Sequence, residues 1–275
     1  VSDWSSDVCS SDLPRERAVS RALADVGSAL ATFLANVGAM GGFLVRILLA
    51  LPASLRRFGL HVRQLWFIGA MSLTIIMLSG LFVGLVLGLQ YYQALSQFGA
   101  SGALGTLTAL SLYRELSPVV AALLFSGRAG TAITAEIGLM RSTQQIEAME
   151  MMAVDPIRYV VAPRFLAAAI ALPLLCVVFS ALAILGAHAS AVLWLGLDNG
   201  TYWSGMVGSV DFVDDLLGGV FKAAVFGVLV GLISVFQGYS AQPTGEGVAY
   251  ATTRTVIHSS IAILAFDFVL TAFLM

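Results

Sequence analysis

Charged residues are scarce in this sequence. Only 11% of its 275 residues are Asp, Glu, Lys or Arg, whereas 59% are hydrophobic, and the mean hydropathy is +0.91. A water-soluble domain carries about 25% charged residues. The composition therefore excludes a water-soluble globular protein of this size and predicts an integral membrane protein. No nucleic-acid partner is expected.

Several catalytic and metal-binding signatures are missing as well. Cys9 and Cys176 are the only cysteines, and their spacing excludes a disulfide framework and a cysteine-type metal site. No two histidines have the H-E-x-x-H spacing and no G-x-S-x-G occurs, so neither a zinc hydrolase nor a serine hydrolase is expected. Lys222 is the only lysine, and no G-x-x-x-x-G-K-[ST] phosphate loop is present. If ATP drives the protein, another chain must bind the nucleotide, and no cofactor is expected here.

Five apolar runs are long enough to cross a membrane, which takes about 20 residues in a helix. Only helices and closed barrels satisfy the backbone in lipid, and these runs are continuous rather than alternating. The sequence therefore predicts an all-α membrane protein. The predicted spans cover about 66–92, 117–139, 160–185, 218–236 and 256–275.

The part of the chain before the first span divides in two. Residues 1–13 are rich in Ser and Asp, resemble translated adapter sequence more than protein, and are predicted to be disordered. Residues 14–63 combine a helical apolar pattern with basic residues, which predicts an amphipathic helix lying in the membrane interface. An additional weak span near 33–52 is the alternative. The membrane domain proper is then 64–275.

An amphipathic segment at 142–154 separates the second and third spans. Ser142 and Gln145 have the S-x-x-Q spacing of a capping box, so Ser142 is predicted to cap a helix N-terminus. Asp155-Pro156 is predicted to end this helix, because the residue before proline is pushed out of the α region. A helix of about three turns is too short to span a bilayer and is expected to lie at the water boundary.

Basic residues are distributed unevenly among the loops. Seven of the 14 Lys and Arg residues precede the first span, and the loops at 93–113 and 195–217 contain none. The positive-inside rule therefore places the N-terminus, the helix at 142–154 and the loop at 237–255 in the cytoplasm, and the C-terminus outside.

Two long stretches carry a specific resemblance. LYRELSPVVAALLFSGRAGTAITAEIGLMRSTQQIEAMEMMAVDPIRYVVAPR (112–164) and ATTRTVIHSSIAILAFDFVLTAF (251–273) resemble the MlaE family of ABC-transporter permeases, and the resemblance extends over about residues 20–275. It implies phospholipid transport across the bacterial cell envelope from the inner membrane, by an interfacial N-terminal helix plus five spans. It also implies a homodimer with two cytoplasmic ATPase subunits that bind ATP, a ring of MCE-domain subunits outside and, in many members, a STAS-domain partner.

Within that resemblance, the helix at 142–154 is the element expected to couple the permease to its ATPase. Glu147 and Glu150 are expected to pair with basic groups of the ATPase while Ile146 and Met149 fill a groove there. A solvated amphipathic loop is the alternative. The residues assigned to ATPase coupling are Gln145, Ile146, Glu147, Met149 and Glu150.

Ionisable residues at or within the spans are costly in hydrocarbon, so they face a cavity or pair with one another. Because cations suit a phosphate head group, we expect Arg114 and Lys222 to hold the lipid, with Glu115 and Asp267 pairing with them when the cavity is empty. Tyr92 is expected at the outer mouth of the cavity or in the aromatic belt. Ion pairs between helices, without lipid contact, are the alternative.

Two further function classes stay open at this point. An intramembrane lipid-modifying enzyme would use Asp267, His258 or Glu115 as acid or base. A channel-like or scaffolding membrane protein is the third possibility.

Overall fold

The computed structural model describes residues 35, 38–52, 54 and 58–274. The predicted tail, 1–13, lies outside these residues, as does much of the predicted interfacial segment. The chain divides into two compact units, one up to Arg46 and one from Ile47 onward. Residues 38–46 of the first unit are helical. They belong to an apolar helix, Gly38–Pro52, that is shorter than a membrane span.

The second unit is helical wherever the structure assigns regular secondary structure to its described residues, and five of its helical stretches are long and apolar enough to cross a membrane. This confirms the predicted fold class and the predicted number of spans. The stretches are Gly59–Ser96, Ser101–Ser142, Ile157–Trp194, Asp215–Tyr239 and Gly245–Phe273.

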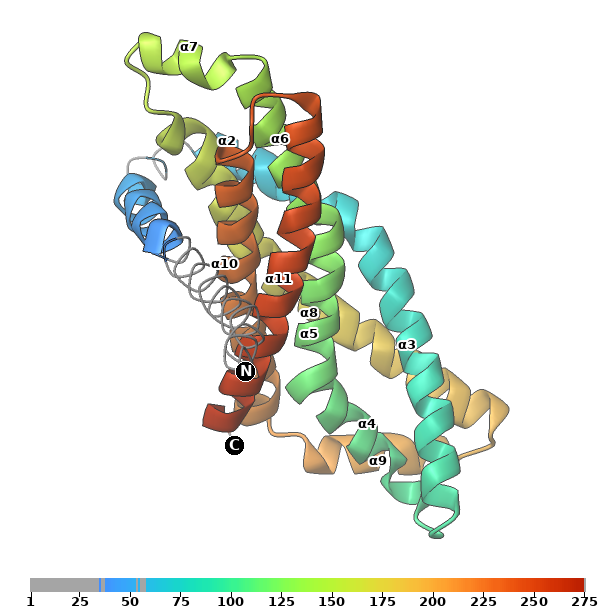
Figure 1. The fold of residues 1–275 in the computed structure, drawn as a ribbon. Coiled ribbons are helices and arrows are strands. Elements are labelled where there is room, and N and C mark those ends of the chain that lie inside the picture. Colours follow the sequence, from blue (N-terminus) through green and yellow to red (C-terminus); the bar gives the residue numbers. More distant parts are fainter. Residues whose placement is uncertain (1–34, 36–37, 53, 55–57, 275) are drawn as a thin grey trace, which may run out of the picture. The chain divides into compact units, whose positions relative to one another are not determined.

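Each of the five stretches is built from named helices, several of which are joined by π-helical segments (η) with a wider turn (Figure 1). The first stretch contains α2 (Phe58–Leu65), η1 (Trp66–Ala70) and α3 (Met71–Ser96). The second contains a 3₁₀ turn, η2 (Ser101–Ala103), then α4 (Leu104–Ser111), η3 (Leu112–Leu116), α5 (Ser117–Phe125), η4 (Ser126–Gly130) and α6 (Thr131–Ser142). The third contains η5 (Ile157–Val161), α8 (Ala162–His188) and η6 (Ala189–Trp194). The last two contain η7 (Phe212–Leu217) with α10 (Gly218–Tyr239), and α11 (Gly245–Leu274).

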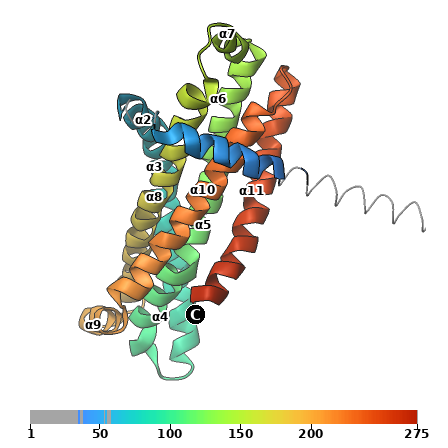
Figure 2. The ribbon, with the colours of Figure 1, turned by 90° about the vertical axis from the view of Figure 1, so that its left-hand side faces the viewer.

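Two short helices mark opposite ends of this bundle. Helix α7 (Gln145–Met151) lies at one end, and α9 (Asn199–Ser209) lies beside α4 at the other (Figures 1 and 2). We call these the α7 end and the α9 end. The last turns of α11 point toward the α9 end.

A glycine stripe brings α3 and α8 into close contact. A Cβ atom added at Gly80 would lie 2.9 Å from the Phe179 carbonyl oxygen, and one at Gly84 would collide with the Ala183 backbone. Small residues let two helix backbones approach this closely. The glycine stripe of α3 therefore packs against α8 of the same chain.

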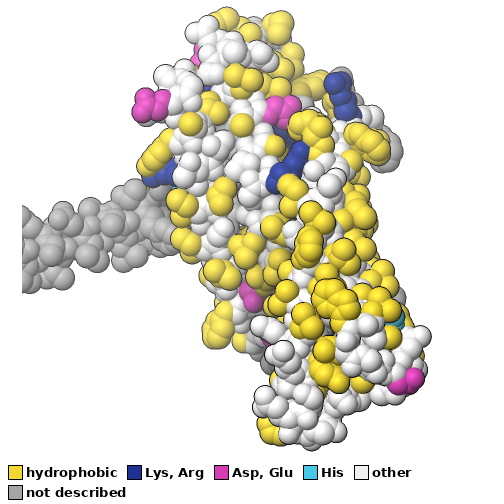
Figure 3. All heavy atoms as spheres, turned by 90° about the vertical axis from the view of Figure 1, so that its right-hand side faces the viewer, with side chains coloured by type: hydrophobic (Ala, Val, Ile, Leu, Met, Phe, Trp, Pro, Cys, Tyr) yellow, Lys and Arg dark blue, Asp and Glu magenta, His cyan; other side chains and the backbone are white. Residues whose placement is uncertain are grey.

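A second pair of glycines, in α10, also allows close packing between two helices. Gly227 and Gly231 of α10 lie against Ala168 and Ala169 of α8, with 3.1–3.2 Å between an added Cβ and the nearest atoms. Helix α8 therefore covers the glycine stripes of both α3 and α10. Many exposed side chains of α3 and α11 are large and apolar, and hydrophobic atoms cover much of the face shown in Figure 3.

The connection between the second and third spans differs from its prediction. Helix α6 continues to Ser142, whose hydroxyl donates to the Leu139 carbonyl at 2.9 Å, so Ser142 is not the N-cap of the next helix. Serine in a last turn can bond back to its own helix instead of capping the next. Gln144 and Ala153, both with φ of 58°, bound α7 on either side. The helix is therefore shorter than 142–154, and Ala153 rather than Asp155-Pro156 ends it.

Candidate functional site

A cluster of ionisable side chains joins three of the spans near the α9 end. Arg114 of η3 contacts Asp215 of η7 through its Nε, 2.6 Å from Oδ1. The Asp215 carboxylate is buried, and its second oxygen accepts the backbone N–H of Asp211 at 2.9 Å. The Arg114 side chain is half exposed. A buried carboxylate thus fixes one side of a guanidinium whose other donors remain accessible.

Lys222 of α10 is the buried cation of this cluster. Its side chain is 4% exposed, and its Nζ donates to the Arg114 carbonyl oxygen at 2.9 Å and to Thr271 Oγ1 of α11 at 2.8 Å. Neither partner is charged. An ammonium placed in a low-dielectric interior with only neutral acceptors retains a strong attraction for an anion.

Asp267 lies one turn before Thr271 on α11 and close enough to Lys222 and Glu115 to interact electrostatically with both. Its Oδ1 is buried and has no hydrogen-bond partner among the described residues. Glu115 is exposed. The structure thus gathers the four ionisable residues predicted from the sequence into one region.

The ion pair of Arg114 differs from the prediction, whereas Asp267 does lie near Lys222 as expected. Arg114 pairs with Asp215 rather than Glu115, and Lys222 bonds to a carbonyl and a hydroxyl rather than to a carboxylate. Sequence reasoning missed both Asp215 and Thr271. The signal available for Asp215 was an acidic residue at the very start of an apolar run. Nothing comparable distinguished Thr271.

Tyr92, the remaining candidate, belongs to a different part of the α9 end. With Tyr91 it packs against a core cluster of Leu104, Ala191 and Tyr202. Tyr202 of α9 is fully buried and donates its hydroxyl to the Ile184 carbonyl at 3.2 Å. Burial, with a smaller contribution from Tyr113, raises the pKa of Tyr202 to about 12. Tyr92 therefore helps to hold α9 against α3 and α8.

At the other end, α7 presents a different set of side chains from the one predicted. Ile146 is 5% exposed, so its side chain packs within the chain and is not available to fill a groove of a partner. Gln145, Glu147 and Glu150 are exposed and Met149 is half-buried. The most exposed apolar side chains of this segment are Met151, the last residue of α7, and Met152 directly after it, which are 88% and 68% exposed. The predicted acidic edge, Glu147 and Glu150, is exposed as expected. The exposed methionines come after these two residues in the chain rather than between them.

Helix α7 is also tied to the end of α10. The Tyr239 hydroxyl donates to Glu150 Oε1 at 3.3 Å. The Arg141 guanidinium donates to the Tyr239 carbonyl oxygen and lies 5.8 Å from the centre of the Tyr239 ring. These contacts connect α6, α7 and α10 at the α7 end.

The chemistry of the Lys222 cluster favours binding over catalysis. It combines a buried ammonium, an accessible guanidinium and a buried carboxyl oxygen without a partner, which together suit a polar head group. His258, considered as a base from the sequence, hydrogen-bonds through Nδ1 to Gln237 at 3.0 Å and belongs to the opposite half of α11.

The family model described as permease MlaE matches residues 61–273. The chain belongs to the MlaE permease family. The intermembrane phospholipid transport system permease protein MlaE of Haemophilus influenzae is 50% identical over 247 residues, which are 90% of this chain and 95% of the relative. A probable ABC transporter permease protein of Rickettsia bellii is 37% identical, over 84% of this chain and 90% of the relative. The chloroplastic protein TRIGALACTOSYLDIACYLGLYCEROL 1 of Arabidopsis thaliana is 30% identical, over 77% of this chain and 60% of the relative.

Membership of the MlaE family confirms the resemblance drawn from residues 112–164 and 251–273. The Haemophilus and Rickettsia relatives are named as permeases, so the lipid-modifying enzyme is the less favoured interpretation. An ABC transporter permease works with an ATPase, which implies an ATPase partner for this chain.

Proposed function

We propose that this chain is the membrane-spanning permease subunit of an ABC transporter that moves phospholipids between the inner membrane and the periplasmic or outer-membrane side. The proposal rests above all on one observation, a buried lysine whose hydrogen-bond partners are uncharged, inside the five-span bundle of an MlaE family member. Lys222 and Arg114 then hold the phosphate of a lipid head group. Glu115 and Asp267 balance their charge, and Tyr92 supports the wall of the α9 end.

Energy for transport comes from a separate subunit in this proposal. ATP is bound by a cytoplasmic ATPase, and this chain carries no cofactor of its own. Its contact surface is α7, where exposed Glu147 and Glu150 meet basic groups while Met151 and Met152 enter an apolar groove. Gln145 and Met149 border that contact.

The proposed orientation places the α7 end in the cytoplasm and the α9 end in the periplasm. The uneven distribution of basic residues supports it, since the loops beside α4 and α9 contain none. The C-terminus is then periplasmic and the N-terminus cytoplasmic. The remaining partners in the proposal are a second copy of this chain, an MCE-domain ring protein on the periplasmic side and a STAS-domain protein on the cytoplasmic side.

The test is isolation of the tagged full-length chain from membranes in mild detergent, followed by measurement of the ATP hydrolysis that elutes with it. We expect hydrolysis to co-elute with the chain. Glu147→Arg combined with Glu150→Arg reverses the acidic edge and is expected to lower the co-eluting activity at least tenfold. Such a loss corresponds to about 1.4 kcal/mol of binding free energy.

Glu246→Arg is the matched control. Glu246 is exposed on α11 but lies outside α7. This variant is expected to retain the ATPase. Equal loss from both variants would argue against α7 as the contact. Lipid turnover by the isolated chain in detergent, without any co-eluting ATPase, would instead support the enzyme interpretation.

A further inference from the structure

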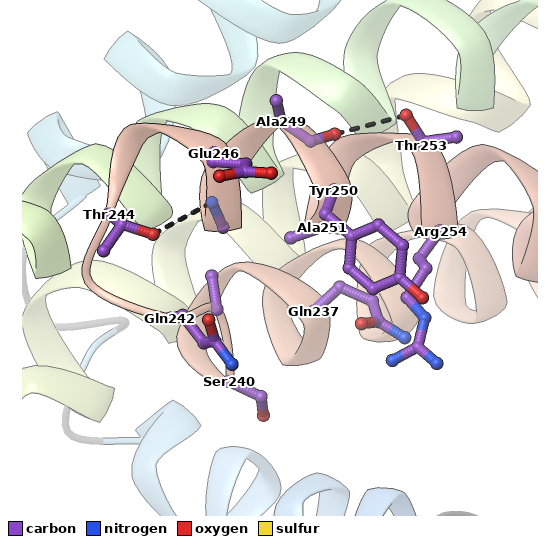
Figure 4. Close-up of a pocket in the computed structure, with 12 residues that line it drawn as sticks. Gln237, Ser240, Gln242, Thr244, Glu246, Ala249, Tyr250, Ala251, Thr253 and Arg254 are labelled. Atoms are coloured by element: carbon purple, nitrogen blue, oxygen red, sulfur yellow. Dashed lines mark hydrogen bonds between the residues drawn. The ribbon is translucent and has the colours of Figure 1, made fainter.

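A polar cavity opens where α10 turns into α11. Its volume is about 750 Å³, within the roughly 300–1,000 Å³ typical of small-ligand sites. Its walls are the last turn of α10, the connecting turn and the first three turns of α11 (Figure 4). The Lys222 cluster lies toward the opposite ends of the same two helices.

Arg254 is the cation of this cavity. Its guanidinium lies 4.8 Å from the centre of the Tyr250 ring, and it makes no ion pair or hydrogen bond with the described residues. Stacking on an aromatic ring holds the guanidinium plane while leaving its N–H donors free. An arginine held in this way is suited to bidentate recognition of a phosphate.

Two more groups turn toward the guanidinium. Figure 4 shows Gln237 of α10 and the hydroxyl of Tyr250 on the same side of the cavity as Arg254. The Gln237 amide is oriented by its 3.0 Å hydrogen bond to His258 Nδ1, which uses one of its two N–H donors. The cavity therefore offers a guanidinium, an amide N–H and a phenol hydroxyl to one ligand group.

Among the described residues that line the cavity, Glu246 is the only one with a carboxylate. It stands eight residues before Arg254, about 12 Å along the helix at 1.5 Å per residue. Figure 4 places it near Thr244, at the other end of the cavity. It leaves the Arg254 end available to an anion.

We propose that this cavity is a second phosphate-binding site, with Arg254 as the anchor and Tyr250 and Gln237 as supporting donors. Asp267, which belongs to the Lys222 cluster, follows Arg254 by 13 residues on α11. This spacing is about 20 Å along the helix. The hydrocarbon core of a membrane is thicker, roughly 30 Å. The two sites thus lie at different membrane depths. The ligand is a phospholipid phosphodiester or a free phosphate, and the choice of phospholipid rests on the proposed function.

The test measures protection of a thiol in the cavity. Ser240 is exposed in the cavity lining, and its hydroxyl makes no hydrogen bond with the described residues, so Ser240→Cys gives an almost isosteric reporter in a chain with Cys9 and Cys176 replaced by alanine. Its alkylation rate is measured with dihexanoylphosphatidylglycerol, with dihexanoylglycerol, which lacks the phosphate, and with inorganic phosphate. Ala249→Cys is a second reporter if the first variant does not fold.

We expect the phospholipid to slow alkylation and the phosphate-free glyceride not to. Arg254→Gln is expected to raise the concentration needed for half protection about tenfold or more, because a charge-assisted bond to phosphate is lost. Arg158→Gln is the control, since Arg158 is exposed and pairs with Asp155 at 3.2 Å. Arg158→Gln is expected to leave the concentration needed for half protection unchanged.

Each other outcome has a definite meaning. Protection by inorganic phosphate at the same concentrations assigns the site to free phosphate. Equal protection by the glyceride, or unchanged protection in Arg254→Gln, overturns the proposal. Because the readout is binding in this cavity, failure here leaves the ATPase co-elution test untouched, and failure of that test leaves this one intact.

Discussion

Lys222 is the single lysine of the chain, and its burial with neutral partners is the costly feature of the bundle. If a phosphate compensates for that cost during transport, Lys222→Gln should lower lipid transport at least tenfold, while Lys222→Glu should abolish it by repelling the anion. The measurement is transfer of labelled phospholipid by the reconstituted transporter. Both variants must still assemble with the ATPase, and a fully active Lys222→Glu complex would remove Lys222 from the site.

Asp198 offers a prediction about pH at the α9 end. The Asp198 carboxylate accepts two hydrogen bonds from Thr201, one from the backbone N–H at 2.8 Å and one from the hydroxyl at 3.1 Å. These bonds cap α9 and lower the pKa of Asp198 below its ordinary value. The pKa of this carboxyl is about 3.9 in the unfolded chain. Because its pKa is lower in the folded chain, the cap contributes its full stabilisation of the fold at any pH above that value. The contribution is lost as the pH falls through the folded-state pKa.

Hydrogen exchange at the Thr201 amide measures this directly. Exchange, corrected for its intrinsic pH dependence, should stay protected at pH 5 and above and lose protection only in strong acid. Asp198→Ala should remove the extra protection at every pH. A loss of protection between pH 6 and 7 in the unchanged chain would contradict the assignment.

At the residue scale, the sequence predicted which ionisable groups matter better than it predicted their partners. Arg114, Lys222 and Asp267 were identifiable because each is a charge in or beside an apolar run, a pattern that one sequence displays. Asp215 lies 101 positions from Arg114, and pairing over that distance depends on how the helices pack. The ion pair between buried Arg164 and half-buried Glu136, 2.7 Å apart, was missed for the same reason.

At the scale of elements, glycine positions distinguish close helix contacts from free surface. Gly84→Ala should destabilise the bundle by about 1–3 kcal/mol, because the added methyl group meets the Ala183 backbone of α8, which cannot move aside like a flexible side chain. Gly127→Ala is the matched control, since apart from its own stretch of helix no described atom lies within 4 Å of the added Cβ. It should be neutral or slightly stabilising.

Thermal unfolding of the two purified variants in the same detergent measures the difference. A lower midpoint for Gly84→Ala together with an unchanged midpoint for Gly127→Ala is the expected result. Similar midpoints for both would mean that α3 and α8 are not packed as closely as described.

The spans were predictable because a bilayer imposes length and hydrophobicity on each helix, and both are visible in one sequence. The start of α7 was not. S-x-x-Q is a local pattern that either of two adjacent helices can use, and here Ser142 completes α6 while Gln144 turns the chain. The exposed methionines were missed because the predicted face assumed a helix that continues past Met151.

At the scale of the whole molecule, the proposed orientation can be measured. Glu147→Cys on α7 and Gly208→Cys on α9 place single exposed thiols at opposite ends of the bundle, in a chain whose native cysteines are replaced. In intact spheroplasts a membrane-impermeant maleimide should label the Gly208→Cys variant and not the Glu147→Cys variant. After lysis both should react. Labelling of Glu147→Cys in intact spheroplasts would reverse the topology and place the proposed ATPase contact on the wrong side.

The wide turns η3 and η4 bracket α5 within the second span. A π turn carries one residue more than an α turn, so removing one residue there leaves an ordinary α turn rather than a broken helix. We therefore expect members of this family to gain or lose single residues at these two points while the rest of the span keeps its partners. One-residue gaps between relatives are expected to gather at 112–116 and 126–130.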